Sequence, residues 1–528
     1  MPFFKTAPFQ SLTVALCLAG MTEVQAESVT LSEMGSEMSI QGELLSFDGD
    51  VYVVRTLLGD LQLSANRSIC EGPGCPATSE VATNLYLAGS GTVTANLIPG
   101  LAQAYFGAFM DDVQRDDSMY GRTYFEIARP TQPDLMVTLV HTNSAAGIDQ
   151  LLGGELHGTF TTRPVDGIEQ SNAAKAGFAP LRSEEQESII AYDSLLVVTH
   201  PSNQIQAMTE TDIASIFAGD IANWQTFGRA PGQINVYLRE DGSNSRELLQ
   251  NALLAPHRKD PGDQVIILGS DIEIAQAVRN DPNGIGLTSF VHRDGVRALE
   301  IEGVCGIRVP ATEFSIKTGE YPLARPIYFY HTAQKAPVVE MGGFADFIAS
   351  NDAQTHVRNA GFIDREIVAE PLNTQGLRVT HTLMGNESIE GLETTRRMLE
   401  LMSYADRLST TIRFDGGAMD LDSEDYQQLE MLADLIRSDD YDGAKFYFMG
   451  FSDSVGRADL NQFIALQRAE IVRQALISRY PELSGRIEAK SVGYGELSPL
   501  ACNETRPGRI KNRRVEIWAQ RPLAVASR

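Results

Sequence analysis

The sequence has little positive charge and no long apolar run. Lys and Arg number 43 against 69 Asp and Glu among 528 residues, which gives a formal net charge of −26. This balance argues against nucleic acid as a partner, because proteins that bind phosphate backbones carry an excess of Lys and Arg. No apolar stretch reaches the roughly 18 to 20 residues that a membrane helix needs. With 43% hydrophobic and 21% charged residues, the composition predicts a globular chain of several domains.

The sequence also lacks the common catalytic patterns. It contains no G-x-S-x-G, no H-E-x-x-H and no P-loop, and its 8 His are scattered along the chain. We therefore predict a binding protein and not an enzyme, with no cofactor and no metal ion.

The first 26 residues have the pattern of a secretory signal peptide. Lys5 precedes a short apolar stretch, Leu12 to Met21, and Val24-Gln25-Ala26 provides small residues before a cleavage point. Cys17 lies inside this stretch, but the bulky Leu16 before it disfavours lipid attachment. We predict that the chain is exported from the cytoplasm.

Export to an oxidising compartment favours disulfides among the remaining cysteines. Cys70 and Cys75 flank the turn-rich segment Glu71-Gly72-Pro73-Gly74, which predicts a local disulfide, and no further ligands for a zinc site lie nearby. Cys305 and Cys502 are far apart in the sequence. They are either free thiols or an interdomain disulfide.

The pattern of apolar residues divides the rest of the chain into four regions. Residues 27–80 are β-rich and include a hairpin of 39–45 with 51–54 around the turn 47–50. Residues 82–365 repeat strand, turn and helix, which predicts an α/β domain with parallel strands. Residues 366–408 form a connector with a charged helix, Glu390 to Leu401. Residues 409–522 follow the order β-α-β-α-β-β, with Ser423 as the expected cap of the first helix.

Donors to an anion recur where strands meet helices in residues 82–365. Four segments provide hydroxyls, backbone N–H groups or a guanidinium, and none of them adds a carboxylate at the centre: 89–92, 144–147, 161–163, and Arg239 with 243–245. Each segment alone is common in proteins, since a Ser at a helix start is usually a cap and a single Arg usually forms a structural ion pair. Together they predict an oxyanion pocket.

In order and spacing, these segments resemble the PstS-like phosphate-binding proteins of ABC transporters. Further points of similarity are Ile216-Phe217-Ala218-Gly219 before Asn223-Trp224, and Gly319 to Leu323 before Arg325. The resemblance implies a two-lobed periplasmic binding protein (type 2) fold, and a cognate transporter permease as a partner. The ligand contacts that it implies are Thr92, Ser144, Thr162, Arg239, Ser243, Asn244 and Ser245.

Two departures from that family affect the choice of ligand. Ser243-Asn244-Ser245 replaces the more usual Ser-Gly-Thr, and Arg163 stands near the position where many members have an Asp. That Asp accepts the proton of hydrogen phosphate, whereas an Arg cannot accept a hydrogen bond. Phosphate is the leading ligand, and its selection over related oxyanions stays open.

The end of the chain resembles the OmpA-like peptidoglycan-binding domain. Gly450 to Asp453, Asn461, Arg468, Gly493 to Glu496 and Asn512 to Glu516 occur in that family's order. The family implies that Asp453 and Arg468 hold the amino-acid end of diaminopimelate, supported by Asn461 and Arg514. A carboxylate for the ammonium and an Arg for the carboxylate suit such a zwitterion.

These observations predict a periplasmic protein that binds phosphate or a related oxyanion and is anchored to peptidoglycan. The alternative is a structural wall-anchoring protein whose binding-protein-like domain engages protein partners and no anion.

Overall fold

The computed structural model describes residues 28–33, 39–47, 51–56, 59–64, 68–72, 74–75, 83–109, 112–119, 121–128, 134–332, 339–384 and 389–522. The predicted signal peptide lies outside these ranges. Within them, no helix combines the length and the apolar character that crossing a bilayer requires. The chain forms two compact units, residues 1–78 and 79–528.

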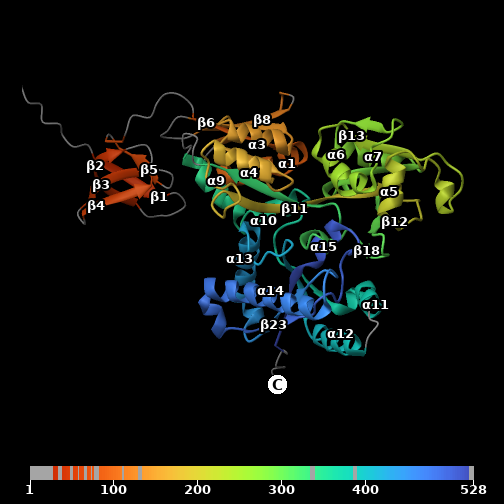
Figure 1. The fold of residues 1–528 in the computed structure, drawn as a ribbon. Coiled ribbons are helices and arrows are strands. Elements are labelled where there is room, and N and C mark those ends of the chain that lie inside the picture. Colours follow the sequence, from red (N-terminus) through yellow and green to blue (C-terminus); the bar gives the residue numbers. More distant parts are fainter. Residues whose placement is uncertain are drawn as a thin grey trace, which may run out of the picture. The chain divides into compact units, whose positions relative to one another are not determined.

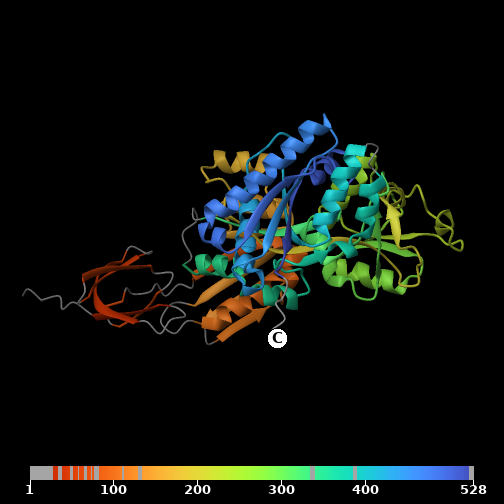
Figure 2. The same cartoon turned by 90° about the horizontal axis from the view of Figure 1, so that it is seen from below.

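The first unit is an antiparallel sheet with the strand order β4-β3-β2-β1-β5, and Figure 2 shows that this sheet is strongly curved. The predicted hairpin is confirmed by the pairing of β2 with β3, although its turn, 48–50, lies outside the described residues. The predicted Cys70–Cys75 disulfide is confirmed. Val29, Leu31 and Val54 form part of the small core. The strands are β1 Ser28–Glu33, β2 Ser39–Phe47, β3 Val51–Thr56, β4 Gly59–Ser64 and β5 Ser68–Glu71.

The second unit begins with a lobe in which β6 is flanked by two parallel neighbours, β9 and β10. β8 alternates between buried and less buried residues, as a strand with one covered face should. The elements of this first lobe are β6 Thr83–Ser90, α1 Gly91–Asn96, α2 Ile98–Phe109, β7 Asp112–Asp116, β8 Arg122–Ala128, β9 Leu135–Thr142, α3 Ser144–Leu152, β10 Gly158–Thr161 and α4 Gly167–Lys175. The chain later returns to add α9 Val339–Ala349 and α10 Gln354–Asn359, and α2 packs against both.

The second lobe repeats the parallel arrangement, with β13 between β14 and β15. In Figure 1 this lobe carries the labels β13, α6 and α7. The succession of strand, turn and helix that the sequence predicts for 82–365 is present at β13 and α6. The elements of this lobe are β12 Ala207–Thr209, α5 Glu210–Phe217, β13 Asn235–Arg239, α6 Asn244–Leu249, β14 Ile266–Leu268, α7 Asp271–Asn280, β15 Gly284–Ser289, β16 Arg297–Ala298, β17 Glu300–Glu302, β18 Arg308–Val309 and α8 Glu313–Lys317. A π-helical turn, Gln250–Leu254, continues α6.

Two long strands join the lobes, β11 (Glu187–Thr199) and β19 (Ala324–His331). The first part of β11 pairs with β19, and its last part pairs with β15. Both pairings are antiparallel, so the prediction of parallel strands in 82–365 does not hold for β11. A strand that passes from one lobe to the other has to fit both sheets, and β11 is buried along almost its whole length.

The C-terminal part of the chain contains the predicted α+β sheet, in the order β20-β21-β24-β22-β23. A short helix, α15, stands between the last two strands, where the sequence predicts none. The charged helix of the connector is α12. The elements are β20 Ala369–Pro371, α11 Gly376–Met384, α12 Ile389–Met402, β21 Asp406–Arg413, α13 Ser423–Arg437, β22 Lys445–Phe451, α14 Ala458–Arg479, β23 Glu488–Gly493, α15 Arg506–Asn512 and β24 Arg514–Gln520.

The prediction that Ser423 caps α13 is wrong. Asp422 is the cap, because its carboxylate accepts the backbone N–H of Asp425. The Asp425 carboxylate in turn accepts the backbone N–H of Asp422. The Ser423 hydroxyl instead donates to Glu187 of β11.

The C-terminal domain contacts both crossing strands and the second lobe. At the start of α13, Glu424 accepts a hydrogen bond from Tyr328 of β19 at 3.0 Å. On the second lobe, Lys511 donates to the backbone oxygen of Glu320 at 2.8 Å. Cys305 and Cys502, which the sequence left either free or bonded, form a disulfide that links the second lobe to the C-terminal domain.

Candidate functional site

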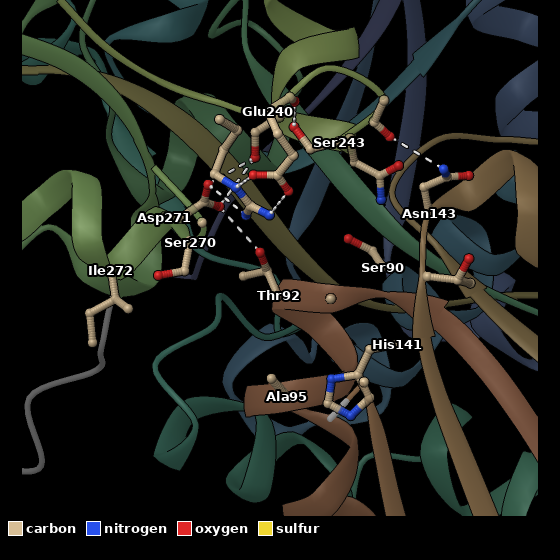
Figure 3. A pocket seen from close by; sticks show the side chains of 18 of the residues that line it. Ser90, Thr92, Ala95, His141, Asn143, Glu240, Ser243, Ser270, Asp271 and Ile272 are labelled. Atoms are coloured by element: carbon tan, nitrogen blue, oxygen red, sulfur yellow. Dashed lines mark hydrogen bonds and ion pairs between the residues drawn. The ribbon is translucent and has the colours of Figure 1, made fainter. Parts of the chain in front are cut away.

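A cavity of about 600 Å³ lies where strand ends of the two lobes meet (Figure 3). Of the seven residues predicted to contact an anion, five line it: Thr92, Arg239, Ser243, Asn244 and Ser245. Thr92 stands in the first turn of α1, directly after β6, and Arg239 is the last residue of β13. Ser243 caps α6 by accepting the backbone N–H of Arg246. The strand–helix junctions thus bring these residues together.

The other two predicted contacts, Ser144 and Thr162, do not line the cavity. The backbone N–H of Ser144 donates to Asn244 Oδ1 at 3.0 Å, and the N–H of Thr162 donates to Ser144 Oγ at 3.1 Å. Both residues are buried, and Ser144 is 0% exposed. They therefore hold the Asn244 side chain in place from the side that faces away from the cavity.

Among the described residues, three hydrogen bonds connect the lobes across the cavity. Besides the bond from Ser144 to Asn244, Asn143 donates to the backbone oxygen of Gly242 at 3.3 Å, and Thr92 Oγ1 donates to Asp271 Oδ2 at 3.2 Å. Figure 3 shows Thr92 and Asp271 linked by a dashed line, with Glu240 close by. The first lobe thus donates all three of these bonds.

The expectation of a centre without carboxylates is wrong, because Asp271 and Glu240 both line the cavity. Asp271 is 2% exposed and begins α7, after the short strand β14. Its carboxylate also accepts the Ser245 hydroxyl at 3.1 Å. The signal in the sequence was Ser270-Asp271, which occupies a strand–helix junction like the four that were recognised.

Arg239 lies between the two carboxylates. Its Nε and one terminal nitrogen donate to Glu240 at 3.2 and 2.5 Å, and its other terminal nitrogen is 3.5 Å from Asp271 Oδ1. Burial by itself would raise the pKa of Glu240, but the hydrogen bonds from Arg239 outweigh it and hold that pKa below the ordinary value. The guanidinium is thus already neutralised by its neighbours.

A second ion pair supports Asp271 from behind. Arg325 is 2% exposed, donates to Asp193 at 2.6 Å, and has a terminal nitrogen 3.8 Å from Asp271. Two imidazoles also line the cavity, those of His141 and His292. Burial lowers the pKa of both, so they are neutral near pH 7 and add no cation to the site.

Arg163 is held away from the cavity by an ion pair. Two of its nitrogens donate to Glu169 at 2.8 and 2.7 Å, and Glu169 also belongs to the capping box at the start of α4. Arg163 is thus a structural residue, and Asp271 places a hydrogen-bond acceptor in the cavity lining, where position 163 offers none.

A second candidate site surrounds Asp453, which follows β22. Asp453 Oδ2 accepts from Arg513 at 2.6 Å, and Oδ1 accepts the backbone N–H of Val455 at 3.0 Å. Asn461, for which the sequence predicts a supporting role, donates to the backbone oxygen of Asp453 at 3.3 Å. Arg513 was not predicted, although it stands beside Arg514 in the same motif.

Arg468 lies on the inward face of α14 and makes no ion pair with Asp453. Its guanidinium is 5.0 Å from the ring centre of Phe414 and donates to the backbone oxygen of Asp415 at 3.5 Å. Burial, followed by the nearby Arg513, lowers the pKa of Arg468. Its Nε has no hydrogen-bond acceptor among the described residues, so this buried cation has donor capacity left over.

The supporting role predicted for Arg514 is contradicted by its position. Arg514 is 0% exposed and donates to Glu516 at 2.7 Å and to the backbone oxygen of Ser498 at 2.8 Å. Glu516 also receives Arg378 at 2.9 Å. Arg514 therefore belongs to a buried ionic cluster, on the opposite side of the strand from Arg513.

Two family models match separate stretches of the chain. Residues 122–352 match the PBP superfamily domain, and residues 413–513 match the OmpA family. The predicted order, a binding-protein domain followed by an OmpA domain, is confirmed.

Individual relatives match one part or the other. The phosphate-binding protein PstS of Borreliella burgdorferi is 26% identical over 188 residues, covering 34% of this chain and 65% of that protein. The peptidoglycan-binding protein ArfA of Mycobacterium bovis is 36% identical over 106 residues, covering 20% of this chain and 31% of that protein. Among solved structures, the ABC-type phosphate transport receptor of Vibrio cholerae is 20% identical, covering 53% of this chain and 99% of that one, with a TM-score of 0.40. The chain thus spans less than two thirds of the length of these two curated relatives.

Proposed function

We propose that the two-lobed domain binds phosphate or a related oxyanion in the periplasm, while the C-terminal domain holds the chain on peptidoglycan. The observation that carries the first part is the convergence of Arg239, the hydroxyls of Thr92 and Ser245, and the carboxylate of Asp271 on one cavity. Hydroxyls and a guanidinium donate to the bare oxygens of an oxyanion. A carboxylate accepts a proton that the oxyanion carries.

This pairing of donors with one acceptor favours phosphate over sulfate. Near neutral pH phosphate keeps at least one proton and can donate it to Asp271, whereas sulfate has none to donate. An unprotonated oxygen placed against Asp271, which is 2% exposed, would meet an uncompensated charge. Asp271 would thus accept the proton of hydrogen phosphate, which Arg163 cannot do.

Ligand capture would use the joint between the lobes. β11 and β19 are strands that pass between the lobes, and the bonds from Thr92 and Asn143 cross the cavity. Separation of the lobes by bending at these strands would open the cavity, and closure would bring both sets of donors onto the anion. The matched PstS is named as phosphate-binding, which supports phosphate as the captured ligand.

At the second site, the proposed ligand is the zwitterionic end of diaminopimelate in the wall peptide. Asp453 would accept from its ammonium group, and the guanidinium of Arg468, whose Nε has no acceptor among the described residues, would bind its carboxylate. Arg513 orients Asp453 through their 2.6 Å ion pair. The match to ArfA, named as peptidoglycan-binding, supports this assignment.

Joined in one chain, the two sites would keep an anion binder near the wall. A transporter permease that receives the ligand is the partner we propose for the two-lobed domain. The predicted signal peptide, residues 1–26, would direct export to the periplasm.

Equilibrium binding of radiolabelled phosphate to the wild-type chain and to Arg239→Ala tests the first site. We expect saturable binding to the wild type and a loss of at least about tenfold in affinity in the variant, since hydrogen bonds to charged groups are worth about 1.5–3 kcal/mol. Arg308→Ala is the control, because Arg308 is half-exposed and pairs with Glu302 away from the cavity. Equal affinity in all three proteins would disprove the assignment.

One observation favours the structural alternative, a wall anchor whose two-lobed domain engages proteins. The guanidinium that should hold the anion is already paired with Glu240 and faces Asp271. Absence of binding with phosphate, sulfate and other oxyanions would leave this alternative standing.

A further inference from the structure

Glu240 occupies the part of Arg239 that an oxyanion would use. Nε and one terminal nitrogen of a guanidinium form a fork that fits two oxygens of one carboxylate or phosphate. In Arg239 this fork donates to the two carboxylate oxygens of Glu240, at 3.2 and 2.5 Å. The remaining terminal nitrogen is turned toward Asp271, 3.5 Å away. The side-on fork of the guanidinium is thus occupied.

The two partners of Arg239 differ in how easily they can leave. The Asp271 side chain is 1% exposed and is fixed by Thr92 and Ser245, whereas the Glu240 side chain is 47% exposed. Glu240 can therefore turn into solvent without breaking packing, and exposed ion pairs are weak. Asp271 has no such freedom.

We propose that Glu240 is an internal competitor for the anion, so that each binding event displaces its carboxylate from the fork of Arg239. This inference rests on the proposed phosphate site. Since Glu240 is the next residue in the chain, its local concentration at the fork is far higher than that of a dissolved monoanion. Simple carboxylates and halides are thereby excluded. An oxyanion that also bonds to Thr92, Ser243 and Ser245 can displace it.

Glu240→Gln tests the competition, because it keeps the shape of the side chain and removes its charge. We expect phosphate to bind roughly three- to tenfold more tightly, the range set by an exposed pair together with the removed repulsion. Asp241→Asn is the matched control. Asp241 is also exposed and lines the cavity, and no hydrogen bond or ion pair joins its side chain to Arg239. It removes the same charge without freeing the fork.

Phosphate is titrated calorimetrically into five proteins: the wild type, Glu240→Gln, Asp241→Asn, Arg239→Lys, and the double variant of Arg239→Lys with Glu240→Gln. The proposal expects a gain for Glu240→Gln that exceeds that of Asp241→Asn, and that shrinks when Lys removes the fork. An equal gain in phosphate affinity for Glu240→Gln and Asp241→Asn would show that Glu240 acts only through its negative charge near the cavity. That result would overturn the proposal. So would unchanged or weaker binding by Glu240→Gln. If the wild type does not bind phosphate at all, the proposed function is wrong, and the proposed competition fails with it.

Discussion

Asp271→Asn should change which anion the cavity prefers. The substitution keeps the size of the side chain. Its remaining oxygen can still accept the hydroxyls of Thr92 and Ser245, which lie at 3.2 and 3.1 Å from the carboxylate in the wild type. The substitution removes the charge that accepts the proton of hydrogen phosphate. A hydrogen bond to a charged group is worth about 1.5–3 kcal/mol, which corresponds to roughly 10- to 150-fold in affinity. We expect the affinity of Asp271→Asn for phosphate to fall by about this factor.

Sulfate should respond in the opposite direction to the same substitution. In the wild type one of its bare oxygens faces the Asp271 carboxylate, so removal of that charge leaves sulfate binding equal or tighter. Competition of sulfate against labelled phosphate measures both affinities in one assay. Asp271→Glu, which keeps the charge, is the companion variant, and thermal unfolding of each protein checks its fold. If phosphate and sulfate weaken by the same factor in Asp271→Asn, the residue is structural and the argument for selectivity fails.

Three further predictions concern the C-terminal domain. Asp453→Ala and Arg468→Ala should each lose retention on purified peptidoglycan, measured by sedimentation, because each removes one half of the zwitterion site. Replacing both Cys305 and Cys502 with Ser should lower the free energy of unfolding by about 2–4 kcal/mol in denaturant titrations, since a disulfide restricts the unfolded chain. Burial, and then Asp422, raise the pKa of Glu424 from 4.5 to about 7, so its stabilisation is complete below pH 4.5 and is lost as pH rises through about 7. The Tm should therefore fall between about pH 5 and 8, and less steeply in Glu424→Gln.

Each of these predictions has a control or a contrary result. Asp459→Ala serves as the control for the wall site, because Asp459 is exposed and pairs with Arg457 at 2.6 Å. Peptidoglycan retention by both site variants would remove the assignment. An unchanged free energy of unfolding in the double Ser protein would show that the disulfide does not stabilise the chain. Parallel pH curves for Glu424→Gln and the wild type would exclude Glu424 as the titrating group.

The local part of the anion site could be predicted from the sequence. Thr92, Arg239 and Ser243 sit at strand–helix junctions, and a junction is visible as an apolar run followed by a turn and a helix cap. Asp271 was missed since β14, the strand before it, is only Ile266–Leu268 and carries mostly exposed side chains. A strand that short has no clear apolar pattern.

The choice between Arg513 and Arg514 could not be made from the motif alone. The two neighbours point to opposite sides, as consecutive residues do where a strand begins. Arg514 opens β24 and turns into the core toward Glu516, which leaves Arg513 facing Asp453. Only the register of β24 against its partner strands decides this.

Contacts between domains were the least predictable feature. The bond between Cys305 and Cys502, which are 197 residues apart, depends on how the second lobe packs against the C-terminal domain. The same packing draws Ser423 away from the role of helix cap toward Glu187. Neither residue carries a local signal of its partner, because the partner is set by tertiary structure.

The central claim, one chain that holds an oxyanion at the wall, is tested most directly by sedimenting purified peptidoglycan with labelled phosphate and the chain without its predicted signal peptide. The account predicts that phosphate sediments with the wall only when the wild-type chain is present. Arg239→Ala should leave the protein on the wall without phosphate, and Asp453→Ala should leave both in solution. Wall-bound wild-type chain that carries no phosphate, or phosphate retained equally by Arg239→Ala, would contradict it.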